Sequence, residues 1–144
     1  MPRKKKYDPA QPSLFELSLK TAPCVPAIRQ AVRDWAINEG YKGATKTSKT
    51  LLNYWFKTDH RLSNGAKFAY YPFQREAVET LIYLYEIAQK RRHKELIESY
   101  VTLPEGQTGS NLRLLQYDLF PRYCLKMATG SGKTKVMALA TAFS

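Results

Sequence analysis

The sequence predicts an α/β protein in which a mainly helical N-terminal region is followed by a strand, a glycine-rich loop and a helix. Two observations predict this order. Apolar residues recur three or four positions apart through much of residues 26–99, which is the spacing of helices with one buried face. A run of strand-forming residues at 122–127 then leads into a Gly-Ser-Gly segment, and helix-forming residues follow it.

The first part of the chain divides into an arm and a helical region. Residues 1–22 are polar, basic at their start and broken by prolines, so they are expected to form a disordered arm. Pro26 stands where a helix begins, and the apolar residues that follow at helical spacing continue up to a stop at Gly40. Ser48 can cap a second amphipathic helix. Residues 23–66 are therefore predicted as a helical N-terminal region.

The middle of the chain has the most regular apolar pattern. A turn is predicted at residues 63–65, and residues 74–99 are then predicted as one continuous helix. The acidic residues Glu79 and Glu86 of this helix are expected to face water. Residues 104–111 contain proline, glycine and small polar residues, which predict a loop before the next element.

The glycine-rich segment near the C-terminus predicts a phosphate-binding loop. Gly130 and Gly132 can adopt positive φ and let backbone N–H groups approach phosphate oxygens closely. The helix that follows turns its free N–H groups and positive dipole end toward the same oxygens. Lys133 is expected to contact the β- and γ-phosphates, and the Thr134 hydroxyl is expected to bind Mg²⁺. The predicted phosphate-binding residues are Thr129, Gly130, Ser131, Gly132, Lys133 and Thr134.

Residues 70–81, Tyr-Tyr-Pro-Phe-Gln-Arg-Glu-Ala-Val-Glu-Thr-Leu, resemble the glutamine motif of superfamily 2 DEAD-like helicases, and this resemblance implies that Gln74 recognises adenine. Its planar amide has one acceptor and two donors, which match the N7 and N6 groups of the base. An aromatic residue just before it, Phe68, Tyr70 or Tyr71, is expected to stack on the base. A glutamine that opens a helix is common in any protein. The phosphate-binding loop that follows in the chain favours the functional interpretation.

These two segments resemble motifs of known ATPases. Residues 127–134 have Met127 where the pattern G-x-x-x-x-G-K-[ST] requires glycine. This form, Met-Ala-Thr-Gly-Ser-Gly-Lys-Thr, resembles motif I of the superfamily 2 DEAD-like helicases. Residues 70–81 resemble the glutamine motif that precedes motif I in those proteins.

Together with Leu-Leu-Asn-Tyr-Trp-Phe at 51–56, the two motifs are similar to the beginning of the res (R) subunits of type I and type III restriction enzymes. The resemblance covers about residues 48–144. It implies an incomplete RecA-like P-loop NTPase domain at residues 67–144, with ATP and Mg²⁺ as ligands. It also implies movement on double-stranded DNA and, as a further partner, a methyltransferase or specificity subunit.

The charge of the chain favours a polyanionic partner. Lysine and arginine number 23 against 12 acidic residues, which gives a formal charge of +11 and a pI near 9.7. Such a field attracts nucleic acid. The basic run at 2–6 is interpreted as a solvated tail. The run at 90–94 is interpreted equally well as helix-end stabilisation or as a DNA contact.

The sequence favours a cytoplasmic protein with no membrane partner. No apolar run approaches the roughly 20 residues that span a bilayer, and the N-terminus has no signal-peptide pattern. Cys24 and Cys124 lie far apart and in no metal-binding motif, so neither a disulfide nor a zinc site is predicted. Cys124 is expected to fill space in the predicted strand.

Binding of ATP is expected of this chain, but hydrolysis is not. Hydrolysis requires an acidic pair on a later strand and arginines from a second domain. No aspartate or glutamate follows Asp118. The chain is therefore expected to be a fragment of a longer polypeptide. Two alternatives remain open, namely a different P-loop enzyme such as a kinase, and a basic nucleic-acid-binding module with a degenerate loop.

Overall fold

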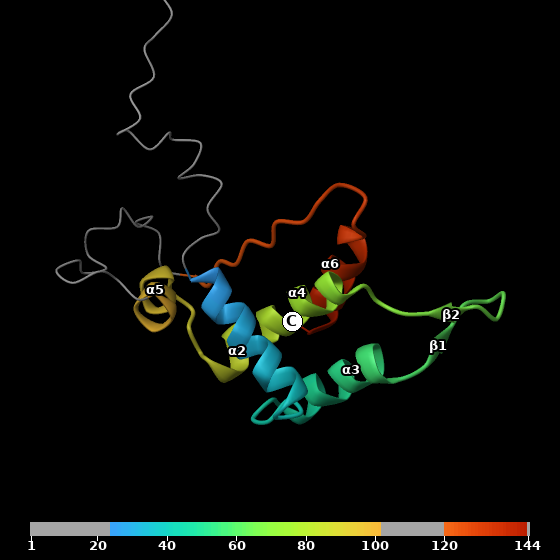
Figure 1. The fold of residues 1–144 in the computed structure, drawn as a ribbon, viewed down its shortest axis with the longest axis horizontal. Helices are drawn as coiled ribbons and strands as arrows, with labels where there is room; N and C mark the ends of the chain where they lie inside the picture. The colour runs from blue at the N-terminus through green and yellow to red at the C-terminus, as the bar shows by residue number, and fades with distance from the viewer. Residues whose placement is uncertain (1–23, 102–119, 144) are drawn as a thin grey trace, which may run out of the picture.

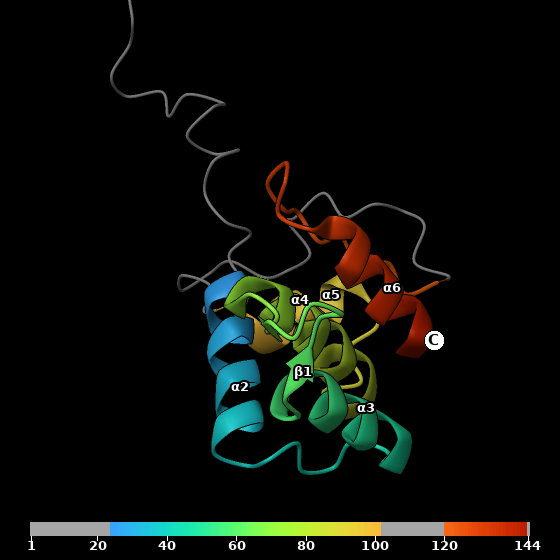
Figure 2. The same cartoon turned by 90° about the vertical axis from the view of Figure 1, so that its right-hand side faces the viewer.

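A computed structural model describes residues 24–101 and 120–143, in which helices α2 (Val25–Ile37), α3 (Lys46–Lys57) and α6 (Lys133–Phe143) pack around the central helix α4 (Pro72–Ile82) (Figure 1). Helices α2 and α6 flank α4 on opposite sides, and α3 packs below it (Figures 1 and 2). The predicted arm and the loop at 104–111 lie outside the described residues. The elements are α2 (Val25–Ile37), α3 (Lys46–Lys57), β1 (His60–Arg61), β2 (Lys67–Phe68), α4 (Pro72–Ile82), η1 (Tyr83–Ile87), α5 (His93–Tyr100) and α6 (Lys133–Phe143).

The first two predicted helices are confirmed, with one correction to a cap. Helix α2 has Pro26 in its first turn and buries one face that includes Val32 and Trp35. Helix α3 begins earlier than predicted, because its cap is Thr45 and not Ser48. The Thr45 hydroxyl accepts a hydrogen bond from the Ser48 N–H at 3.2 Å. The Ser48 hydroxyl is buried and donates to Glu86 at 2.6 Å instead.

The single helix predicted over residues 74–99 is wrong. Helix α4 ends at Ile82, and the π-helical segment η1 follows, in which the N–H of Ala88 donates to the carbonyl of Tyr83. Gln89 then has φ of +50°, in the left-handed region, and α5 starts only at His93. Contacts outside the helix explain the interruption, because Glu86 in η1 accepts three hydrogen bonds from Thr45 and Ser48. Glu86 is therefore only partly exposed, contrary to the prediction.

Glu79 is also buried, with 5% of its surface exposed, although it was predicted to face water. The Tyr41 hydroxyl donates to it at 2.6 Å, and Arg75 Nε donates at 2.8 Å. Arg75 also donates to the Tyr41 hydroxyl at 3.1 Å, so the three polar groups satisfy one another. This closed network explains why a carboxylate is tolerated inside the fold. Burial, and then the hydrogen bond to Glu79, raise the pKa of the Tyr41 phenol above its ordinary value.

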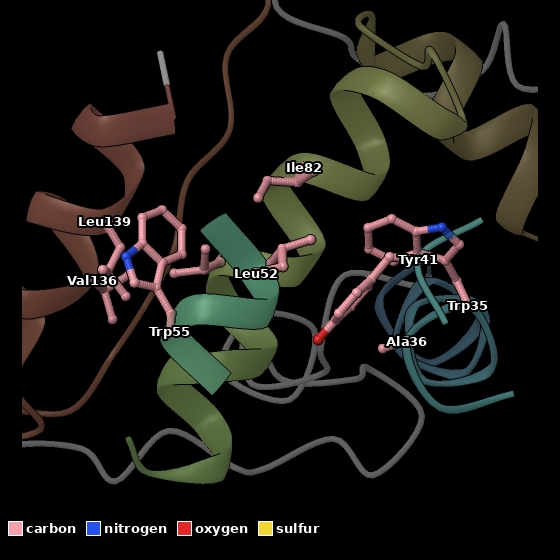
Figure 3. Close-up of a cluster of buried hydrophobic side chains, with 9 residues drawn as sticks. Trp35, Ala36, Tyr41, Leu52, Trp55, Ile82, Val136 and Leu139 are labelled. Atoms are coloured by element: carbon pink, nitrogen blue, oxygen red, sulfur yellow. The ribbon is translucent and has the colours of Figure 1, made fainter. Parts of the chain in front are cut away.

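One apolar core joins the N-terminal helices to the C-terminal helix. Val136 and Leu139 of α6 lie beside Trp55 of α3 (Figure 3). Leu52 and Ile82 are fully buried in the same cluster. Helix α6 is therefore anchored to the same core as α3 and α4, although it lies far from them in the sequence.

The strand predicted at residues 122–127 does not form, and the sheet in the described part of the chain is the antiparallel pair β1–β2. A strand needs a neighbour to satisfy its backbone groups, and in the described ranges none pairs with residues 122–127. Cys124 is accordingly exposed and fills no core space. The incomplete RecA-like domain stays a prediction, since a mainly helical arrangement with a two-stranded sheet is all that these ranges contain.

The network of Tyr41 predicts a specific loss of stability at alkaline pH. A phenol with a raised pKa holds its proton longer in the folded state, so the free energy of unfolding should fall as pH rises above about 10. Urea denaturation between neutral and strongly alkaline pH measures this fall. Tyr41→Phe should cost about 1 kcal/mol at neutral pH and make the alkaline fall shallower. An unchanged slope in Tyr41→Phe would contradict the assignment.

Candidate functional site

The predicted loop forms a tight turn directly before α6. Gly130 and Gly132 both have φ of +76°, a conformation that residues with a side chain rarely adopt. The Ser131 N–H donates to the Ala128 carbonyl at 3.3 Å, and the Ser131 hydroxyl donates to the same oxygen at 2.6 Å. Helix α6 begins at Lys133, immediately after the second glycine. The order of glycine turn and helix is therefore as predicted.

Several backbone donors at the start of α6 have no backbone partner in residues 24–101 and 120–143. Within the described residues, no backbone hydrogen bond uses the N–H groups of Gly132, Lys133 or Thr134. The first N–H groups of any helix lack partners within that helix, and they carry the positive end of its dipole. Lys133 and Thr134 are also exposed. Three adjacent amides, an ammonium and a hydroxyl thus share the start of α6.

Gln74 lies directly against this turn, 57 residues earlier in the chain. Its Nε2 donates to the Ser131 carbonyl at 2.9 Å, and its Oε1 accepts from the Tyr71 N–H at 3.0 Å. The side chain is only 3% exposed. A Cβ atom on Gly132 would overlap Nε2 of Gln74, so the second glycine is needed for close approach as well as for its φ. Sequence reasoning placed Gln74 near adenine and missed its contact with the loop.

The aromatic residues before Gln74 have different surroundings. Phe68 meets Tyr70 edge to face, with centroids 5.0 Å apart, and Lys135 Nζ lies 3.9 Å from the Phe68 centroid. Lys135 belongs to the first turn of α6, so Phe68 is the predicted stacking residue that contacts the helix of the loop. Tyr71 instead stacks on Phe73 with an interplanar angle of 6°, and both rings are exposed.

The site offers little to hold a metal ion by itself. In the ranges that the structure describes, no group of three or more His, Cys, Asp or Glu side chains could hold a metal. The acids of α4 are engaged elsewhere, since Glu76 pairs with Arg29 and Glu79 with Arg75. A magnesium ion on the Thr134 hydroxyl would therefore take its other ligands from phosphate oxygens and water.

The core anchors the loop in this position. Val136 and Leu139 bury one side of α6 against α3 and α4, one turn and two turns after the glycines. Gln74 lies in the first turn of α4, whose later turns reach the same core through Val78 and Ile82. The glycine turn and Gln74 are therefore both fixed to the same hydrophobic core, one through α6 and the other through α4.

Comparisons of the chain with known protein families, curated proteins and solved structures found no match. Among the described residues, no helix is both long and apolar enough to cross a membrane. The arrangement of Gln74, the glycine turn and α6 is thus interpreted on its own geometry.

Substitution of the two glycines separates backbone strain from close approach. Gly130→Ala should cost about 1–3 kcal/mol through its φ alone, because nothing lies near a Cβ atom there. Gly132→Ala should cost at least about 1 kcal/mol more, since Gln74 must move and lose its hydrogen bonds. Urea denaturation without nucleotide measures both. The losses of unfolding free energy caused by Gly132→Ala and by Gln74→Ala should be non-additive in the double variant. Strictly additive losses would contradict the contact between Gly132 and Gln74.

Proposed function

We propose that this chain binds ATP with Mg²⁺, as the ATP-binding part of an ATP-dependent DNA helicase or translocase similar to a restriction-enzyme R subunit. The observation that carries the proposal is the contact between Gln74 and the turn at residues 129–132. Two segments with the chemistry of adenine recognition and phosphate binding lie side by side, although 57 residues separate the bonded groups.

The phosphates would lie at the start of α6. The free N–H groups of Gly132, Lys133 and Thr134 donate to phosphate oxygens, and the helix dipole favours the negative charge. The ammonium of Lys133 neutralises the β- and γ-phosphates. The Thr134 hydroxyl binds the Mg²⁺ ion that bridges them. Thr129, Gly130 and Ser131 shape the turn around the phosphate chain.

The adenine would lie beside Gln74 and Phe68. Gln74 uses one amide N–H and its oxygen within the protein, which leaves its second N–H for the N7 acceptor of the base. Phe68 provides a flat apolar surface for stacking. The base would displace the ammonium of Lys135, which lies 3.9 Å from the Phe68 ring centroid.

The formal charge of +11 supports double-stranded DNA as the macromolecular partner of this ATPase. A methyltransferase or specificity subunit as a further partner, and a cytoplasmic location, belong to the same proposal. ATP hydrolysis does not, because the two acids of α4, Glu76 and Glu79, are already paired with arginines. The chain alone should therefore bind ATP without turning it over.

Replacement of Lys133 tests the phosphate site. Lys133→Ala should weaken binding of Mg-ATP by roughly ten-fold or more, since charged hydrogen bonds contribute about 1.5–3 kcal/mol. Isothermal titration calorimetry on the full chain measures the affinity. Lys49→Ala, which removes the same charge from an exposed position of α3, is the control and should change little. Equal losses in both variants would show that only net charge matters. If the unmodified chain showed no saturable binding of Mg-ATP, the proposal would fail, and a basic nucleic-acid-binding module would be the remaining interpretation.

Replacement of Gln74 tests base recognition. If the amide reads adenine, Gln74→Ala should lower the affinity for ATP by about 1 kcal/mol more than the affinity for GTP. Competition titrations with both nucleotides measure the difference. A residue that only braces the loop would lower both affinities equally, and that result would contradict adenine recognition.

A further inference from the structure

A second concave site lies under the β1–β2 hairpin. The hairpin extends away from the helices, on the side of α3 and α4 (Figure 1). A hollow of about 400 Å³ opens between the hairpin and these helices, which is the size range of small-ligand sites. It is lined by residues 55–60, by residues 67–70 and by Pro72 and Arg75.

This hollow is separate from the proposed phosphate site. Neither Gln74 nor any residue of 128–135 lines it. Phe68 lines the hollow, and its ring also contacts Lys135, which does not. The Phe68 ring therefore forms a wall between the hollow and the start of α6. A ligand in the hollow would not occupy the place of the triphosphate.

Aromatic rings form one side of the hollow. Tyr70 contacts the other two rings edge to face. Its ring centroid lies 5.0 Å from that of Phe68 and 5.5 Å from that of Phe56. All three rings are partly exposed, and all three residues line the hollow. Partly exposed rings of this kind are platforms on which a flat ring can stack.

Cations dominate the rest of the lining. Lys57, Lys67 and Arg75 line the hollow, and Asp59 is the acidic residue among the lining groups. Asp59 pairs with Lys67 at 3.2 Å, and Arg75 pairs with Glu79, which does not line the hollow. Lys57 has no ion pair in the described part of the chain, and its Nζ lies 4.8 Å from the Tyr41 centroid. The lining is net positive, and Lys57 and Lys67 are exposed at its rim.

We propose that the hollow binds a nucleotide unit of a single-stranded nucleic acid. An unpaired base stacks on the ring of Tyr70, and the flanking phosphates contact Lys57 and Lys67. A duplex keeps its bases paired and stacked, so it cannot present a face to this ring. An acidic peptide would complement the positive charge of the lining, but its carboxylate side chains have no flat ring that could stack on the aromatic residues. This site goes beyond ATP binding, because it lies outside the phosphate loop.

Binding of a fluorescein-labelled oligothymidylate to the full chain tests the proposal by fluorescence anisotropy without nucleotide. The double variant Lys57→Gln/Lys67→Gln should bind the strand roughly ten-fold more weakly and show a shallower salt dependence, by about 0.7 in slope for each lost phosphate contact. The matched control Lys46→Gln/Lys49→Gln removes the same charge from exposed positions of α3 outside the hollow. It should bind nearly as tightly as the unmodified chain.

Photo-cross-linking of a strand with 5-iodouridine, followed by mass spectrometry, should identify Tyr70. Equal losses of affinity in the two double variants, or a cross-link outside the hollow, would overturn the proposal. Poly-glutamate binding that depends on Lys57 and Lys67, without strand binding, would overturn it too and identify an acidic peptide as the occupant. Lys133→Ala should leave strand binding unchanged, so this test and the ATP test fail independently.

Discussion

The hydrogen bond from Gln74 to the Ser131 carbonyl is the contact on which the arrangement of the candidate site depends. It joins the first turn of α4 to the glycine turn before α6, and Gln74 also holds the Tyr71 N–H at the start of α4. Because Val136 and Leu139 anchor α6 to the same core, the turn is held from both sides. A loop held in this way would lose less conformational entropy on binding a ligand, which would favour affinity.

The helices that depend on local patterns could be predicted from the sequence. Spacing of apolar residues places α2 and α3, and Pro26 marks the start of the first. The predicted long helix fails because tertiary contacts replace the local preference. Glu86 is held by Thr45 and Ser48 from another segment, and no periodicity contains that information. Tertiary hydrogen bonding likewise buries Glu79, which an amphipathic pattern places on the solvent side.

The backbone conformation of the two loop glycines could be predicted from the sequence, and the contacts of the candidate site could not. The glycines of the loop require positive φ, and the motif therefore anticipated Gly130 and Gly132. It did not anticipate that Gly132 is in contact with Gln74, because the contact spans distant segments. Residues 122–127 have the composition of a strand but do not form one, because composition cannot supply the neighbouring strand that is needed for pairing. The hollow under the hairpin is also invisible in the sequence, since its lining combines α3, β2 and α4.

The most direct measurement of the central claim is an NMR titration of the ¹⁵N-labelled chain with Mg-ATP. We expect saturable shifts of the backbone amides of Gly132, Lys133 and Thr134, because these donors have no backbone partner in the described residues. The side-chain amide of Gln74 should shift at the same ligand concentrations. Resonances of these groups that stay in place while ATP is added, or shifts confined to the basic surface elsewhere, would contradict binding of ATP at the start of α6.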